Sequence, residues 1–559
     1  MPETKADPWV FRDDHKKING EEFRRELASR VRQLVLSTED QSSVLAALIQ
    51  AGQLESALCD LDHEDSECRQ ITDCLAEVYG GNDRLGAGRA GRILARLSCP
   101  QSFTVSTPEG FAYYNLRPDD FSNAAAKFKP GEPTAVIGIR SIGTTLSAVV
   151  LASLRKSGRP AERITVRPNG HPYNRITNLS VQQKIWITKW KEQNANFLIV
   201  DEGPGRSGST FLSVAEALVE HGVSAERILL FGSRDPDISS LCANDAAVRW
   251  SRLQFTNVQP EIQERFRGCS YIGGGEWRRI FLADGTLWPA CWTEMERAKF
   301  LSRDRNYFYK FEGLGAHGQS TLQRAGALAK AGFGPAVKDD GEGFAAYGVV
   351  RGRPLSSRDL TTQLLDRIAH YLAFRNAEFR VSRPNDGILS KMFSFNFELE
   401  FGQEWLGDLD PLASASSVIT DARMQPHEWI LTSGGVLKTD ATSHGDDHFL
   451  PGPCDIAWDL AGASVEWAME AVAIDYLLSR FQHLTGDDVR KRFATFQLAY
   501  ALLRLSYCRM ALTTMRGTPE ETRFAQACPH YRDIVIRLTG HSIEPQVQEL
   551  HHATSSISQ

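Results

Sequence analysis

The sequence lacks the features that mark membrane-embedded and secreted proteins. No stretch of its 559 residues approaches 18 consecutive apolar residues, so no transmembrane helix is expected. The opening segment, MPETKADPWVFRDDHKK, is polar and has no apolar core, so a secretory signal is not expected either. Ten cysteines are present, but no CxxC pair occurs, and a chain of this length needs no disulfides for stability. We therefore expect a cytoplasmic protein that makes no membrane contact.

The sequence also lacks an excess of basic charge. Its 63 lysines and arginines stand against 69 aspartates and glutamates, giving a net charge of −6. Broad binding to nucleic acid requires clustered basic residues that neutralise phosphates, so we expect no broad nucleic-acid surface. A small anionic ligand needs only a local site, and the overall charge does not exclude one. At roughly 100–200 residues per domain, the length predicts about three domains.

The first half of the chain changes in pattern near residue 99. Residues 1–98 carry apolar residues at helical spacing, as in EEFRRELASRVRQLVL and VLAALIQAGQLESAL, and we expect a helical N-terminal module. Residues 99–240 alternate short apolar runs with amphipathic segments, a pattern typical of a doubly wound α/β domain with a parallel sheet. The runs at 135–139, 197–200 and 228–231 predict three buried strands.

The second half is expected to form another domain. Residues 241–275 carry few strong signals and are expected to be a linker. Residues 276–545 begin β-rich, in WRRIFLADGTLW and NYFYKFEG, and then become helix-rich, which predicts a small β lobe followed by a larger helical lobe. The polar end of the chain, 546–559, is expected to be a flexible tail.

The most informative segment is FLIVDEGPGRSGST at 197–210. It reads as a buried strand, two acids, and a loop rich in glycine and hydroxyl residues that opens a helix. A helix N-terminus offers unpaired N–H groups and a positive dipole end to a phosphate. Glycines let the backbone approach the ligand closely, and hydroxyls add donors. Asp201 and Glu202, at the carboxyl end of a strand, could accept hydrogen bonds from ribose hydroxyls or hold a magnesium ion.

This segment resembles the signature of the type I phosphoribosyltransferases, which has four apolar residues, two acids, and a loop ending in Thr-Gly-x-Thr/Ser. The resemblance implies that Asp201 and Glu202 contact the ribose of phosphoribosyl pyrophosphate, with Mg²⁺, and that the following loop binds its 5′-phosphate. The predicted phosphate-binding residues are Gly205, Arg206, Ser207, Gly208, Ser209 and Thr210. The chain departs from the signature in two ways: the loop is one residue longer, and Ser207 replaces threonine.

Two neighbouring segments support this resemblance. GIRSIGT at 138–144 follows an earlier strand, where the family carries its pyrophosphate-binding loop. There Arg140 would offer a fixed cationic fork beside backbone N–H groups, together with Ser141, Gly143 and Thr144. The basic stretch 163–175, which includes Arg167, occupies the place of the family's flexible catalytic loop. Closing it over the pyrophosphate would exclude water and stabilise developing charge.

The resemblance implies a reaction as well as a ligand. A nitrogen of a nucleobase-like acceptor would attack C1′ of phosphoribosyl pyrophosphate while Mg²⁺ and Arg140 hold the leaving pyrophosphate. Asp201, Glu202 and Arg140 are the expected catalytic residues, acting through positioning and electrostatics. We therefore expect a phosphoribosyltransferase, that is, a glycosyltransferase, whose partners are two small molecules.

The C-terminal domain carries a second pattern. Lys310 lies in an apolar run (NYFYKFEG), and DARMQPHEWIL at 421–431, Asp440 and CDIAWDLAG at 454–462 follow in order. This order resembles the aminoglycoside-phosphotransferase branch of the kinase fold. The resemblance implies that Lys310 pairs with nucleotide phosphates, that Asp440 holds Mg²⁺, and that Asp459 braces the catalytic loop.

The match weakens where the chemistry of a kinase should be. With the pattern aligned on Pro426, Arg423 falls on the position of the general base and Glu428 on that of a metal-binding asparagine. An arginine cannot accept the substrate's proton, so Asp421 is the candidate to replace it. Kinase activity, with ATP as a further cofactor, therefore stays open. The metal site is open as well: Mg²⁺ could bind at Asp440 and Glu428, or a transition metal could bind in KTDATSHGDDHF at 438–449.

Two alternatives to a phosphoribosyltransferase remain. The chain could be a small-molecule kinase whose α/β domain senses a nucleotide, or a non-catalytic scaffold or regulator that responds to nucleotides. The sequence is compatible with a homo-oligomer.

Overall fold

The chain divides into two compact units in a computed structural model. The model describes residues 7–12, 15–36, 41–61, 66–81, 85–129, 131–171, 173–205, 207–258, 262–282, 285, 288–382, 387–413 and 416–540. The N-terminal unit comprises residues 13–277 and 293–349, and the C-terminal unit comprises residues 1–12, 278–292 and 350–559. The predicted domain at 276–545 is thus divided between the two units. Arg206 and the predicted tail 546–559 lie outside the described residues.

The expected helical module is present at the start of the N-terminal unit. It contains α1 (Gly20–Leu36), α2 (Gln41–Cys59), α3 (Ser66–Tyr79) and α4 (Gly86–Arg96), with β1 (Lys16–Asn19) paired antiparallel to β2 (Ser102–Val105). Helix α2 is apolar on nearly all sides and is buried from Val44 to Leu58 except at Gln53. A helix that is apolar all round must be covered all round. Accordingly α2 contacts α1, α3 and α7, and the module shares one hydrophobic core with the sheet that follows.

The predicted parallel sheet follows after two short helices, α5 (Glu109–Ala112) and α6 (Pro118–Ala126). Its strand order is β4-β3-β7-β8-β9, and every neighbouring pair is parallel. The strands are β3 (Thr134–Ile139), β4 (Ala161–Val166), β7 (Asn196–Val200), β8 (Ile228–Gly232) and β9 (Gln254–Asn257). The three strands predicted from the sequence are β3, β7 and β8.

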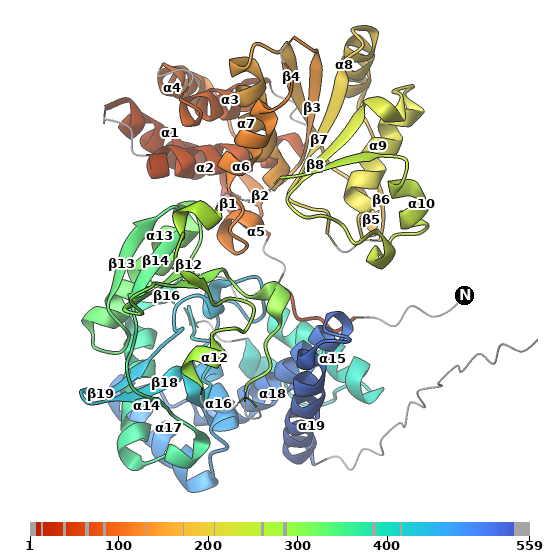
Figure 1. Cartoon of the computed structure of the whole chain (residues 1–559). Coiled ribbons are helices and arrows are strands. Elements are labelled where there is room, and N and C mark those ends of the chain that lie inside the picture. The colour runs from red at the N-terminus through yellow and green to blue at the C-terminus, as the bar shows by residue number, and fades with distance from the viewer. Residues whose placement is uncertain are drawn as a thin grey trace, which may run out of the picture. The chain divides into compact units, whose positions relative to one another are not determined.

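Helices cover both faces of this sheet, as a doubly wound arrangement requires (Figure 1). Successive strand residues point to opposite faces. Val136 and Leu198 belong to the core shared with α7 (Ile142–Lys156) and the helical module, whereas Ile137 and Ile199 belong to a second core. That second core is completed by α8 (Val181–Glu192), α9 (Ser209–Glu220) and α10 (Ala246–Trp250). The short hairpin β5 (Asn169–His171) and β6 (Asn174–Ile176) lies between β4 and α8 in the chain.

The segment 241–275, which we expected to be a linker, is structured instead. It contains α10, the fifth parallel strand β9, the short helix α11 (Ile262–Arg265), and β10 (Ser270–Tyr271) of the next sheet. Strand β9 has only four residues and is mostly half-buried, so its sequence shows neither a long apolar run nor clear alternation. The α/β domain therefore extends beyond residue 240.

A five-stranded antiparallel sheet completes the N-terminal unit. Its order is β10-β11-β12-β14-β13, with β11 (Lys299–Leu301), β12 (Tyr307–Phe311), β13 (Val337–Gly341) and β14 (Phe344–Gly348). Helix α13 (Gly315–Lys330) lies against β13 and also against α2 of the helical module. This is the small β lobe that the sequence predicts, and it packs on the N-terminal module through α13.

The C-terminal unit is mainly helical, as expected. Its long helices are α14 (Thr362–Glu378), α15 (Ile388–Phe401), α16 (Ala457–Glu466), α17 (Ala471–Thr485), α18 (Arg490–Thr514) and α19 (Pro519–Thr539). Short elements between them include α12 (Arg278–Phe281), β15 (Arg353–Pro354), β16 (Arg380–Val381) and β17 (Ser417–Val418), and the hairpin β18 (Trp429–Thr432) and β19 (Gly435–Lys438). Near the start of the chain, Val10 accepts a hydrogen bond from the backbone of Leu450.

Two general expectations can be compared with the structure. All ten cysteines are free thiols, in agreement with the absence of disulfides that we expected. Among the described helices, none is long and apolar enough to span a bilayer.

Candidate functional sites

The predicted acid pair lies at the carboxyl edge of the parallel sheet. Strand β7 ends at Val200, and the backbone N–H of Asp201 still donates to Phe231 of β8, so the two acids leave the sheet at a fixed place. The loop that follows leads into α9, which begins at Ser209 after Gly208 in the left-handed conformation (φ 66°). The strand–acids–loop–helix order that we predicted is therefore present.

Burial changes the acid–base properties of this pair. Desolvation raises the pKa of Asp201 to about 7, although the charge of Arg167 opposes the shift. Desolvation also raises the pKa of Glu202 to about 7, with Arg234 opposing and Asp201 adding to the shift. Neither carboxylate forms an ion pair with a residue that the structure describes. Two neighbouring acids with so little local compensation favour a cationic ligand, and oxygen donors suit Mg²⁺.

The pyrophosphate-loop segment that we predicted lies next to this pair. A Cβ placed on Gly143, in the first turn of α7, would be 2.5 Å from the carbonyl oxygen of Val200 and 3.3 Å from Oδ1 of Asp201. Similarly, a Cβ on Gly110 would be 2.7 Å from Oε2 of Glu202. Glycine is therefore required at Gly143, where the contact is to backbone, whereas a side chain at position 110 would displace the carboxylate of Glu202. The structure brings the segment 141–144 and the acids together at one edge of the sheet.

The predicted phosphate-binding residues cluster at the start of α9. The Ser207 hydroxyl accepts a hydrogen bond from the backbone N–H of Ser209 (3.2 Å) and lies 3.0 Å from its hydroxyl. Ser209 is buried, Thr210 is half-buried, and Gly205 is exposed. The Ser207 hydroxyl thus satisfies the first backbone N–H of α9, that of Ser209, which is one of the N–H groups a helix leaves unpaired at its start. A phosphate at this helix end would compete with that hydroxyl.

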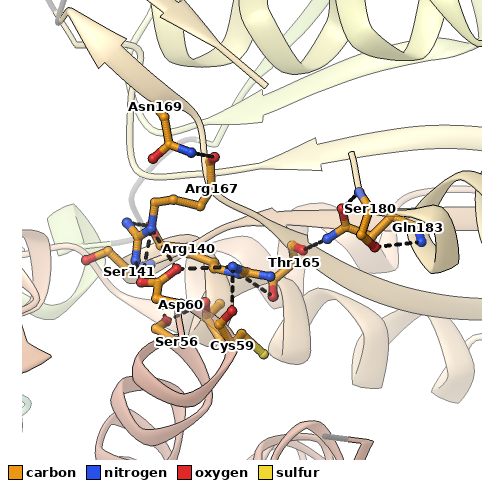
Figure 2. A network of polar contacts seen from close by, with 11 residues as sticks. Ser56, Cys59, Asp60, Arg140, Ser141, Thr165, Arg167, Asn169, Ser180 and Gln183 are labelled. Carbon is orange, nitrogen blue, oxygen red and sulfur yellow. Dashed lines mark hydrogen bonds and ion pairs between the residues drawn. The ribbon is translucent and has the colours of Figure 1, made fainter. Parts of the chain in front are cut away.

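The two arginines expected to bind pyrophosphate share one carboxylate, that of Asp60 (Figure 2). Nη1 of Arg140 donates to Oδ1 of Asp60 (3.1 Å) and to the carbonyl oxygen of Cys59 (3.0 Å). Nε of Arg167 donates to Oδ1 of Asp60 (3.1 Å), and its Nη1 donates to the carbonyl oxygen of Arg140 (2.8 Å). Asp60 directly follows α2, so a residue of the helical module neutralises both cations. Sequence reasoning missed Asp60 entirely.

A cavity of about 110 Å³ lies beside this group, at the start of α7. Ser141, which precedes α7 with φ 105°, lines it together with Thr145, Arg167 and Asp60. The remaining lining residues come mainly from α2 and from the chain after β2: His15, Ile49, Gln53, Ser56, Ala57, Leu61, Thr104, Val105, Ser106 and Pro108. The candidate site therefore includes a wall that the helical module supplies.

The basic stretch 163–175 is only partly the mobile loop that we expected. Arg163 belongs to β4, is buried, and donates to both oxygens of Glu55 in α2 (2.8 and 2.7 Å) and to Asp73 in α3. It is a structural residue that fastens the sheet to the helical module. The exposed part of the stretch is the β5–β6 hairpin, which Arg167 precedes.

Lys310, the predicted nucleotide-binding lysine, forms an ion pair within the β lobe. It is buried in β12, and its Nζ lies 3.3 Å from Oε1 of Glu312, two residues further along the chain. The same Glu312 oxygen accepts a hydrogen bond from the hydroxyl of Tyr347 (2.7 Å). Residues two apart on a strand share a face, so the sequence did contain the signal for Glu312.

In the C-terminal unit, Asp459 braces the loop after β17, as the resemblance implies. Its Oδ2 accepts the backbone N–H of Asp421 (2.7 Å), and its Oδ1 accepts that of Ala422 (2.9 Å). Asp459 is fully buried at the start of α16. Charge-assisted bonds to two successive N–H groups fix the path of the loop, including Ala422 at φ 60°.

Asp421, the candidate proton acceptor, is buried and surrounded by donors. Its carboxylate accepts hydrogen bonds from the Tyr371 hydroxyl and from the backbone N–H of Arg423 (3.1 Å), and it lies 3.2 Å from Nζ of Lys438. Both of its oxygens are therefore engaged within the protein. This environment stabilises the loop and does not favour proton transfer to Asp421 from a substrate.

The two predicted metal-binding residues, Glu428 and Asp440, do lie together. With His444 they form a group whose ligand atoms all fall within 4.8 Å of one another. Nε2 of His444 is 3.3 Å from Oδ2 of Asp440, and Glu428 is also held by Nζ of Lys438 (2.8 Å). Burial raises the pKa of Glu428, against the opposing charge of Lys438. Two carboxylates and an imidazole fit a divalent cation, and the histidine extends the choice beyond Mg²⁺.

Comparisons with known proteins find similarity in solved structures only. No family model and no curated relative matches the chain. A choline/ethanolamine kinase family protein from Mesorhizobium loti is 15% identical (TM-score 0.31), covering 47% of this chain and 97% of that one. The choline kinase LicA from Streptococcus pneumoniae is 14% identical (TM-score 0.29), covering 42% and 89%.

A third similar structure is a thermostable mutant of aminoglycoside phosphotransferase APH(4)-Ia, in a ternary complex with ADP and hygromycin B. It is 13% identical to this chain, with a TM-score of 0.27, and the match covers 50% of this chain and 98% of that one. The three descriptions name kinases and a phosphotransferase, and none of them names a phosphoribosyltransferase.

Proposed function

We propose that the N-terminal unit binds phosphoribosyl pyrophosphate with Mg²⁺ and transfers its phosphoribosyl group to a nucleobase-like acceptor. The observation that carries this proposal is the convergence of three segments at one edge of the parallel sheet. These are the acid pair Asp201 and Glu202, the start of α9 at Ser207–Thr210, and the start of α7 at Ser141–Thr144. The carboxyl edge of an open parallel sheet is where such folds bind ligands.

Each segment has a chemical role in this proposal. The hydroxyls and backbone N–H groups at the start of α9 receive the 5′-phosphate, and Asp201 and Glu202 accept hydrogen bonds from the ribose hydroxyls or hold the cation. A bound Mg²⁺ would supply positive charge to the leaving pyrophosphate. Arg140 and Arg167 lie on the side where that pyrophosphate would develop charge, and they would stabilise it through charge-assisted hydrogen bonds.

Asp60 gives this site a built-in competitor. It occupies the donors of Arg140 and Arg167 that a pyrophosphate would need. Binding therefore requires the arginines to exchange one carboxylate for a more highly charged anion. Because Asp60 is one-third exposed, the exchange costs little. Asp60 would thus weaken binding without preventing it.

Isothermal titration calorimetry on the full chain tests the proposal. We expect saturable binding of phosphoribosyl pyrophosphate that requires Mg²⁺. The double substitution Asp201→Asn with Glu202→Gln should weaken it by about a hundredfold, or ~2.7 kcal/mol. Glu226→Gln is the matched control, because Glu226 lies just before β8, at the amino edge of the sheet. Unchanged affinity in the double variant would reject the site. Binding without release of pyrophosphate in the presence of nucleobases would instead favour a sensor or regulator.

A second candidate function is small-molecule phosphotransfer, and the group Glu428, Asp440 and His444 favours it. This group stands beside a loop that Asp459 braces, an arrangement able to hold a metal–nucleotide complex. The engaged carboxylate of Asp421 and the arginine at 423 argue against a conventional proton acceptor there. Asp440→Asn should abolish any metal-dependent ATP turnover, measured as ADP release, and leave phosphoribosyl pyrophosphate binding unchanged.

A further inference from the structure

A small cavity in the C-terminal unit is lined by an arginine, Arg423, that forms no ion pair with any residue the structure describes. The cavity has a volume of about 40 Å³ and is lined by Arg423, Arg504, His444, Asp447 and Tyr507. Its other walls are mainly apolar: Val10, Ala422, Phe449, Leu450, Trp458, Tyr500 and Leu503. All of these residues belong to the C-terminal unit, including Val10 near the start of the chain. Neither candidate function described above uses Arg423.

The position of Arg423 is fixed although its charge is not paired. Its backbone N–H donates to Asp421, on the loop that Asp459 braces, so the main chain at this point is held on both sides. Within the described part of the chain, no carboxylate forms an ion pair with its guanidinium. Despite burial and the opposing charge of Arg504, the pKa of Arg423 is raised by Tyr507, Glu428 and Asp440. Arg423 is half-buried and faces a cavity with mainly apolar walls, so its guanidinium could form hydrogen bonds to an anion there.

Other cations near this loop are paired within the protein. Lys438 contacts the carboxylates of Asp421 and Glu428, and Nε of Arg504 lies 3.4 Å from Oε1 of Glu466. The one carboxylate that lines the cavity, that of Asp447, is engaged by the backbone N–H of Phe449 (2.8 Å) and lies 3.6 Å from Nδ1 of His444. Among these cations, the guanidinium of Arg423 is therefore the one that forms no ion pair with a described residue.

We propose that this cavity binds a compact oxyanion, the phosphate or carboxylate group of a small ligand, through Arg423. A guanidinium forms paired hydrogen bonds to two oxygens of such a group, and apolar walls strengthen them by excluding water. The volume exceeds that needed for one water molecule and suits a group of a few heavy atoms. Arg504 adds positive charge on the same cavity. Position 423 is where the kinase pattern has its proton-accepting side chain. With arginine there, the site would instead select an anionic group.

Hydrogen–deuterium exchange of the full chain, with and without inorganic phosphate, tests the proposal. Binding should slow exchange in residues 444–450 and 500–507, the segments that line the cavity. Arg423→Gln should weaken phosphate binding by about tenfold or more at these segments. It should leave any protection at residues 207–212, in the N-terminal unit, unchanged. Arg358→Gln, at an exposed arginine of the C-terminal unit, is the control and should behave as the wild type.

Further variants separate the remaining outcomes. Arg423→Lys keeps the positive charge but lacks the paired N–H donors of a guanidinium, so it should bind phosphate with intermediate affinity. If Arg423→Gln does not fold, Arg423→Lys replaces it in the test. Repeating the titration with acetate distinguishes a phosphate group from a carboxylate. Absence of protection with both anions, or protection that persists unchanged in Arg423→Gln and Arg423→Lys, would overturn the proposal.

Discussion

The two acid-rich regions of the molecule differ in how their carboxylates are compensated. At the carboxyl edge of the parallel sheet, Asp201 and Glu202 are half-buried without an ion pair among the described residues, and their pKa values rise to about 7. In the C-terminal unit, Asp421 and Glu428 are held by Lys438, and Asp421 is also held by Tyr371. Under the proposed function the first pair would bind an external cation, whereas the second region supplies much of its own positive charge.

This difference agrees with the proposed ligand site at the sheet edge and with a loop around Asp421 that the protein stabilises itself. Burying a carboxylate without a counter-charge is costly, and a protein retains such an arrangement where a ligand compensates it. A carboxylate with engaged donors on each oxygen contributes instead to the fold. In the C-terminal unit, Arg423 forms no ion pair with a described residue and lines a separate cavity.

The largest expected effect comes from removing the brace of the C-terminal loop. Asp459→Ala would leave the N–H groups of Asp421 and Ala422 without acceptors in a buried place. We expect a loss of about 3–5 kcal/mol in the unfolding free energy of this unit, measured by urea denaturation. Asp475→Ala is the control, because Asp475 is 73% exposed and its ion pair with Arg490 lies at the surface. Equal stability of both variants would show that the loop is not braced as described.

The raised pKa values of the sheet-edge acids predict a pH dependence. Mg²⁺ binds the deprotonated carboxylates, so its affinity should fall by about tenfold or more between pH 8 and pH 6. Without a cation, the unfolding free energy of this unit should fall as the pH rises through 7. The folded state holds protons there that the unfolded chain has already released. Calorimetric titration of Mg²⁺ at several pH values checks the first effect. A pH-independent affinity would contradict the shifts.

A smaller effect is expected from Asp60. Asp60→Asn removes the charge that engages Arg140 and Arg167, and pyrophosphate should then bind about fivefold more tightly, a gain of ~1 kcal/mol. Glu67→Gln is the control, because Glu67 forms a surface ion pair with Arg96 in the same helical module. Calorimetry with inorganic pyrophosphate measures both variants. Weaker binding in Asp60→Asn would mean that Asp60 positions the arginines and does not compete with the ligand.

The smallest effect on the affinity for phosphoribosyl pyrophosphate is expected from Lys310. Lys310→Met keeps the length of a buried side chain and removes its contact with Glu312. If the sites act independently, the affinity for phosphoribosyl pyrophosphate should change by less than about twofold, while any binding of ATP is lost. Fluorescence titration with a labelled nucleotide and calorimetry with phosphoribosyl pyrophosphate check the two parts. A large loss of both would show that the sites are coupled.

The sequence predicted the sheet edge well because its signals are local. The apolar run 197–200, the acids at 201–202 and the glycine–hydroxyl loop follow one another directly, and parallel strands align their carboxyl ends. The pairing of Arg140 and Arg167 with Asp60 could not be read in this way. Asp60 lies 80 residues before Arg140 and 107 residues before Arg167, and its position depends on how α2 packs against α7.

Other differences also arise from tertiary contacts. Arg163 looked like part of a solvated basic loop, yet Glu55 and Asp73 of the helical module bury its charge within β4. Strand β9 was missed because four half-buried residues carry no clear periodicity. In the C-terminal unit, the spacing around Pro426 correctly placed Glu428 near Asp440. His444 completes that group because residues 444–446 form a short helical turn.

The most direct test of the central claim is a crystal structure of the full chain grown with phosphoribosyl pyrophosphate and Mg²⁺. We predict electron density for the phosphorylated ribose over Asp201 and Glu202, with its 5′-phosphate at Ser207–Thr210 and its pyrophosphate beside Ser141 and Arg140. Ligand density confined to the C-terminal unit, or a sheet edge left empty at saturating ligand, would contradict the account.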